Sequence, residues 1–112
     1  MHLIRLKKRK SFTLLTHKGL KRVHPAFVLQ AYPNQFPETR LGFTVSKKNG
    51  GAVQRNRIKR RLKEAARFIF PSFARPGYDY VLIGRRAAAS LPFEQLKKEM
   101  ADALQNDSLY TK

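Results

Sequence analysis

The residues best suited to bind another molecule lie together in one stretch of the chain, from Ser46 to Glu64. Two lysines follow an apolar segment, then Gly50 and Gly51, then a segment of helical character with basic residues on most of its surface. Like charges packed side by side repel one another and cost stability, so the fold itself gains little from them. A partner with many negative charges explains this stretch better.

The chemistry that these side chains offer is phosphate binding, because Arg binds phosphate bidentately and Lys binds it as a point charge. Placed at 100° per residue, the helix has a narrow apolar stripe for packing on a sheet: Ile58, Leu62, Ala65, Ala66 and Ile69. Its opposite side presents Asn56, Arg60, Lys63 and Arg67, with Arg57 and Lys59 on the two shoulders. The open alternative is a solvated face whose charges only keep the protein soluble. Such faces usually mix signs, whereas Arg60 and Glu64 form the only i, i+4 pair of opposite sign here.

No pattern in the sequence indicates catalysis by protein side chains. Glu38 and Glu64 stand apart in the basic half, no histidine has a partner at a suggestive spacing, and no Walker-type phosphate loop is present. The three histidines are scattered, and the chain has no cysteine. We therefore expect no catalytic group and no metal site in the protein, and no disulfide framework.

Composition places the charge in one part of a single domain, residues 1–112. The net charge is +17; residues 1–67 hold 18 basic and 2 acidic side chains, and residues 68–112 hold 6 basic and 5 acidic ones. Nucleic acid and an anionic membrane surface are the two polyanions to consider. No apolar run approaches the ~20 residues that span a bilayer, and none is long enough for a signal peptide. We expect a cytoplasmic protein without a membrane partner.

The elements that must position the basic stretch follow from turn signals and periodicity. We expect a basic arm over residues 1–10, a short helix that Ser11 caps and Gly19 ends, and a basic connector over 21–25. Strands are predicted over 26–32, 40–48 and 78–84, the last apolar on both faces and therefore central. Helices are predicted from Ala52 to about Phe70, stopped by Pro71, and from Pro92 onward with an apolar stripe of Phe93, Leu96, Met100 and Leu104. The order helix–strands–helix–strand–helix predicts a two-layer α/β sandwich with one sheet.

A second candidate surface lies on the strand over residues 40–48. Its two rows differ: Leu41, Phe43 and Val45 point to one face, and Gly42, Thr44, Ser46 and Lys48 to the other. The second row is small and polar, so it forms a shallow floor rather than a packed core. Phe12 beside this floor could stack on an unpaired base or anchor the first helix in the core; Tyr32 presents the same alternatives.

These residues resemble the protein subunit of bacterial ribonuclease P, over nearly the whole chain. The family signature is matched by Ser46-Lys47-Lys48, Gly50, Ala52-Val53 and Arg55-Asn56-Arg57-Ile58-Lys59-Arg60. Three further segments resemble the family's opening, its strand before the signature and its last strand: Leu6-Lys7-Lys8 with Phe12, Arg40 to Val45, and Asp79 to Ile83.

The resemblance implies an RNA-binding subunit of a tRNA-processing endoribonuclease, in which a catalytic RNA removes the 5′ leader of precursor tRNA. The Mg²⁺ is held by RNA and substrate, not by the protein, and no DNA partner is expected. Contacts to the RNA subunit would come from Lys47, Lys48, Arg55, Asn56, Arg57, Lys59, Arg60 and Lys63. The single-stranded leader would lie against Lys8, Phe12, Gln30, Tyr32, Thr44, Ser46 and Lys48. The resemblance also implies a ribosomal-protein-like α+β fold with a mainly antiparallel sheet and a left-handed βαβ crossover, where the general rule gives a right-handed one.

Two departures from the family affect the aromatic lining of the leader cleft. Thr16 stands where members often have a second aromatic residue, and Gln30 where some have Tyr. A non-enzymatic RNA-binding module is the runner-up function, and a membrane-active cationic protein is the third. Leader removal assayed with the catalytic RNA distinguishes the first two.

Overall fold

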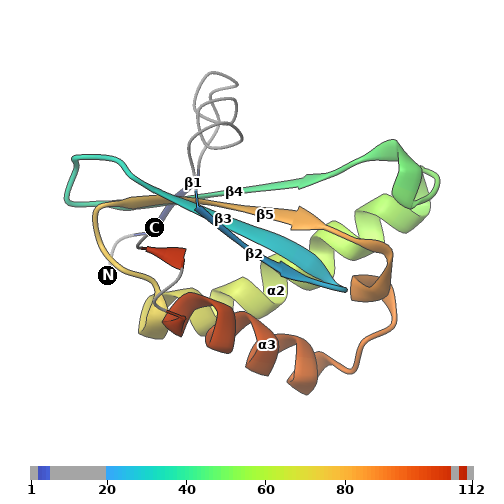
Figure 1. Ribbon diagram of the computed structural model, residues 1–112. Helices are drawn as coiled ribbons and strands as arrows, with labels where there is room; N and C mark the ends of the chain where they lie inside the picture. The colour runs from blue at the N-terminus through green and yellow to red at the C-terminus, as the bar shows by residue number, and fades with distance from the viewer. Residues whose placement is uncertain (1–2, 6–19, 107–108, 111–112) are drawn as a thin grey trace.

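The computed structural model describes residues 3–5, 20–106 and 109–110, and in them one sheet carries two helices on the same face (Figure 1). The five strands are β1 (Leu3–Arg5), β2 (Leu20–His24), β3 (Phe27–Pro33), β4 (Thr39–Val45) and β5 (Tyr78–Gly84). The helices are α2 (Ala52–Phe73) and α3 (Phe93–Gln105), and two 3₁₀ turns, η1 (Lys47–Asn49) and η2 (Arg86–Ala89), flank them in the chain. This arrangement confirms the predicted two-layer sandwich.

The strand order β1-β4-β5-β3-β2 places β5 at the centre, as its apolar faces predicted. The sheet is mixed: β4 pairs in parallel with β1 and β5, while β3 pairs antiparallel with β5 and β2. Antiparallel pairing predominates only slightly, because the β4–α2–β5 crossover and the β1 edge each add a parallel pairing. The hand of that crossover stays a prediction, and the helix expected from Ser11 lies outside the described residues.

Alternation along the strands puts the core between the sheet and the helices. Phe27 and Leu29 of β3 and Tyr80 and Leu82 of β5 are fully buried on the helix side, where Leu41 of β4 joins them. The apolar stripe of α2 meets them with Ile58, Leu62, Ala65, Ala66 and Phe70, and α3 adds Leu96, Met100 and Leu104. Both helical stripes are confirmed, with Phe93 only partly buried at the start of α3.

Helix α2 lies very close to the end of the sheet because Gly84 has no side chain there. A Cβ on Gly84 would come within 2.6 Å of Ile58 Cγ2 and 2.8 Å of Val45 Cγ2. At its other end α2 continues through Pro71 to Phe73, so the expectation that Pro71 stops it is wrong. Proline keeps a helical φ, so the helix can continue past Pro71, although it lacks the N–H that would bond to the Arg67 carbonyl.

Two edge strands replace segments that were expected to be irregular. Residues 21–25 were expected to be a connector, yet β2 occupies Leu20–His24 and pairs with β3. Residues 3–5 of the expected basic arm form β1 on the opposite edge, paired with β4. An edge strand with exposed, charged residues such as Lys21 and Arg22 is hard to predict from sequence. Without a continuous buried face, the strand shows no alternation of apolar and polar residues.

The end of the described chain is fixed by three tyrosines. The hydroxyls of Tyr80 and Tyr110 lie 3.0 Å apart, and the Arg75 backbone N–H donates to Tyr80. Tyr78 packs edge-on against Tyr110, whose hydroxyl donates to the Leu104 carbonyl. Burial, assisted by the hydrogen bond that Tyr80 donates to Tyr110, raises the pKa of Tyr80 far above its ordinary value of 10.0.

Candidate RNA interface

The chain enters α2 through a tight turn that places the first two signature lysines. Lys47 and Lys48 lie exposed in η1, and Gly50 follows with φ of 121°, a left-handed conformation that favours glycine. The Asn49 side chain donates to Ser46 Oγ at 3.0 Å and to the Gly84 carbonyl at 3.4 Å. The turn is therefore fastened to the end of β5. The expected strand over 40–48 ends earlier, at Val45, which removes Lys48 from the strand row on which it was predicted.

The exposed side of α2 carries cations with few partners. Among the described residues, the side chains of Asn56, Lys59 and Arg60 make no hydrogen bond or ion pair, and Lys63 contacts only the ring face of Phe43, 5.9 Å away. The single acid on the helix, Glu64, pairs with Arg67 at 3.0 Å rather than with Arg60. These cations remain free to meet phosphates.

Two further arginines of α2 are held by the segment that follows β5. Arg57 Nε donates to the Ala89 carbonyl at 3.1 Å, and Arg61 donates to the carbonyls of Ala89 and Leu91. From the same segment, Arg86 donates to the Lys48 carbonyl at 3.2 Å. Sequence reasoning missed the structural role of Arg61 and Arg86, because their partners lie 30 and 38 positions away in the chain. Arg55, half-buried beside the apolar stripe, is also not on the exposed side.

The sheet face away from the helices holds the second set of predicted residues. Its strand registers align Gln30 with Val81 and Gly42, and Thr44 with Ile83 and Val28, in two adjacent rows. Tyr32 lies in the next row, against Asp79. The face has an aliphatic centre with polar groups on both sides. Gln30 is buried, with 5% of its surface exposed, and its Oε1 has no hydrogen-bond partner among the described residues.

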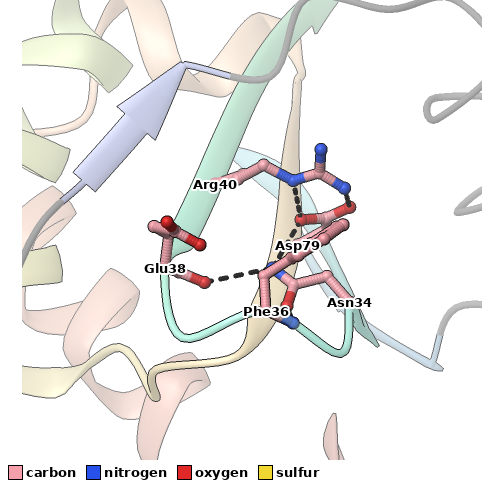
Figure 2. Close-up of polar contacts among 5 residues, drawn as sticks. All are labelled: Asn34, Phe36, Glu38, Arg40 and Asp79. Atoms are coloured by element: carbon pink, nitrogen blue, oxygen red, sulfur yellow. Dashed lines mark hydrogen bonds and ion pairs between the residues drawn. The ribbon is translucent and has the colours of Figure 1, made fainter.

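A cluster of charged and polar side chains, not predicted from the sequence, lies at one end of this face (Figure 2). Arg40 binds Asp79 bidentately, with 2.6 and 2.5 Å between donor and acceptor atoms, and Asn34 donates to the same carboxylate at 2.9 Å. Asn34 also spans the β3–β4 turn through the Glu38 carbonyl and the Phe36 N–H. The hydrogen bond to Asp79 raises the pKa of Arg40, and the Asp79 carboxylate balances the charge of the guanidinium within the protein.

The structure therefore separates the predicted residues into two surfaces. One comprises η1 and the exposed side of α2, with Lys47, Lys48, Asn56, Arg57, Lys59, Arg60 and Lys63. The other is the open sheet face with Gln30, Tyr32 and Thr44, and Ser46 continues the chain just beyond β4. Lys8 and Phe12 lie outside the described residues. Within the described ranges, no grouping of three or more His, Asp or Glu side chains could hold a metal ion, and no helix is long and apolar enough to cross a membrane.

The fold and these surfaces define a small α+β protein with a strongly basic helix, the class of protein that binds nucleic acid. Comparison with known proteins is specific: the family model for ribonuclease P matches residues 2–107. The chain belongs to the ribonuclease P protein family.

Individual relatives align with this chain over most of their length. The chain is 43% identical to the ribonuclease P protein component of Paramagnetospirillum magneticum, an alignment covering 89% of this chain and 79% of the relative. It is 41% identical to that of Erythrobacter litoralis, over 88% and 81%. The RNase P protein structure of Staphylococcus aureus matches with a TM-score of 0.76 and 30% identity, covering 96% and 97% of the chains. That of Thermotoga maritima gives 0.78 and 28%, over 90% and 94%.

Proposed function

We propose that this chain is the RNA-binding subunit of a ribonuclease P, assembling with a catalytic RNA to remove the 5′ leader from precursor tRNA in the cytoplasm. Family membership supports a role in a tRNA-processing ribonuclease. The observation that carries the assignment of surfaces is the set of unpaired side chains on α2: Asn56, Lys59 and Arg60 have no internal partner in the described structure. Cations left free by the fold are available to replace the counterions of an RNA.

The two surfaces suit different RNA segments. The α2 surface is strongly charged, so it fits the phosphates of a structured RNA, which a protein recognises largely through backbone and shape. The open sheet face has aliphatic Val81 and Ile83 at its centre and Gln30 and Thr44 beside them. Such a mixture suits the bases of a single strand, and we assign the leader to it.

Hydrolysis is assigned to the RNA, with Mg²⁺ held by RNA and substrate. A surface of lysines and arginines attracts phosphates and repels divalent cations. Its contribution is to neutralise RNA charge, so that the assembled particle needs less Mg²⁺ to hold its RNA strands together.

Reconstitution with a bacterial catalytic RNA tests this function. Leader removal from precursor tRNA is measured at low Mg²⁺ with and without the protein, and we expect strong stimulation by the protein. The absence of stimulation refutes the proposed function. Cleavage by the protein alone refutes the assignment of the chemistry to RNA.

A further inference from the structure

A hollow lies where α2 passes the start of α3, at the edge of the predicted RNA-binding surface. It has a volume of about 590 Å³ and is lined by Arg57, Arg60, Arg61, Lys63, Glu64 and Phe93. A second hollow of about 440 Å³, beside Val53, Asn56 and Lys59, shares Arg60 and Lys63 with it. The first, called here the α2–α3 hollow, lies within the ~300–1,000 Å³ range of small-ligand sites.

Two of the cations in the α2–α3 hollow are held in place before any ligand arrives. Arg57 uses its Nε, and Arg61 both terminal nitrogens, on the Ala89 and Leu91 carbonyls. The terminal nitrogens of Arg57 have no partner among the described residues. A guanidinium fixed through Nε loses little further freedom when its outer N–H groups bind a phosphate, which raises its value as a ligand.

An aromatic ring adjoins these cations. Phe93 is only partly buried and meets the 55% exposed Phe68 edge-on, with ring centroids 6.4 Å apart. The Lys97 ammonium lies 5.3 Å from the Phe93 centroid and 4.8 Å from that of Phe68. Part of the Phe93 ring therefore stays available to the hollow. A ring next to phosphate-binding cations is the combination that binds an unpaired nucleotide.

The remaining side chain gives the hollow a chemical preference. Glu64 is an acceptor, tethered by Arg67 at 3.0 Å. A carboxylate disfavours a phosphate beside it but accepts hydrogen bonds from an exocyclic amino group, such as N4 of cytosine. Uracil offers a carbonyl oxygen at that position, which would face the carboxylate without a proton between them.

We infer that the α2–α3 hollow binds one unpaired nucleotide of the RNA partner, with its phosphate on Arg57 and Arg60, its base on Phe93, and a preference for cytosine over uracil set by Glu64. The inference rests on the proposed function and adds a nucleotide site to it. Duplex RNA has no free base to place there, so it binds only the exposed cations of α2.

The test uses the full chain and fluorescence anisotropy with oligocytidine, oligouridine and an RNA duplex. We expect Phe93→Leu, which keeps an apolar side chain, to weaken oligocytidine binding about tenfold and to leave duplex binding unchanged. Glu64→Gln alters a half-exposed side chain and should not affect folding. We expect it to abolish a preference for oligocytidine of about fivefold or more in the wild-type protein.

Phe36→Leu and Glu38→Gln are matched controls at the β3–β4 turn, outside the hollow, and should leave both oligonucleotides unaffected. Equal losses for single strand and duplex in Phe93→Leu, or an unchanged base preference in Glu64→Gln, overturn the inference. Leader removal with the catalytic RNA is measured in parallel. The two assays separate the two proposals. If the wild-type protein stimulates leader removal but the Phe93 and Glu64 variants bind oligonucleotides as the controls do, the nucleotide site is overturned and the proposed function stays in place.

Discussion

Arg60 and Arg61 are neighbours in sequence with opposite roles, and the same substitution in each separates them. Arg61→Lys keeps the charge but replaces a fork of donors by one ammonium. Arg61 serves two backbone carbonyls, those of Ala89 and Leu91, whereas Arg60 is exposed and serves none. The control is therefore Arg60→Lys.

The expected cost follows from counting these bonds. A lysine at position 61 can reach one of the two carbonyls. The Ala89 carbonyl keeps its hydrogen bond from Arg57. The single ammonium of the lysine cannot bond to the Ala89 and Leu91 carbonyls together as Arg61 does, so one hydrogen bond is lost. A hydrogen bond from a charged donor contributes about 1.5–3 kcal/mol. We expect Arg61→Lys to lower the free energy of unfolding by about 2 kcal/mol, and Arg60→Lys to change it by less than about 0.5 kcal/mol.

Urea denaturation followed by circular dichroism measures both values under identical conditions. Binding of RNA over a range of salt concentrations provides the second measurement, and its salt dependence should be the same in the two variants because the charge is kept. Identical urea midpoints for the two lysine variants would refute the view that Arg61 fastens the segment after β5 to α2.

Three further changes test other parts of the structure. Arg60→Gln should weaken RNA binding by ~1–3 kcal/mol and reduce the salt slope by about one, without loss of stability; an unchanged slope would contradict a phosphate contact. Asp79→Ala leaves Arg40 unpaired at the end of the sheet and should cost roughly 2–3 kcal/mol in urea unfolding, and a neutral result would mean that the cluster in Figure 2 contributes little. Because Tyr80 has a raised pKa in the folded state, its stabilising effect is complete below pH ~10 and is lost as the pH rises further. Tyr80→Phe should therefore flatten the decline in stability measured between pH 9 and pH ~11, and equal declines would argue against this linkage.

The sequence predicted the features that depend on local periodicity. The buried faces of β3 and β5 and the stripes of α2 and α3 follow from spacings of two or of three to four residues. The basic side of α2 follows from the same projection. The edge strand β2 was missed because its residues are exposed and charged, and Pro71 was misread because a proline keeps a helical φ and does not have to end a helix.

The parts that could not be predicted depend on contacts between distant residues. Asp79 and Arg40 lie 39 positions apart and become neighbours only through the parallel pairing of β4 with β5. Arg57 was predicted to contact RNA, which stays a prediction, but its bond to Ala89 belongs to no local pattern. No periodicity in a single sequence encodes such a pair, because it arises from how the chain crosses back over the sheet.

The bonds from α2 to the segment after β5 also bear on how the surface matures during synthesis. The helix can form as soon as its own residues are made, yet the carbonyls that orient Arg57 and Arg61 belong to Ala89 and Leu91. A nascent chain that ends before those residues carries the charges of α2 without the groups that orient two of them. In the proposed function, the fully oriented α2 surface is therefore complete only after the later part of the chain has emerged and β5 has entered the sheet.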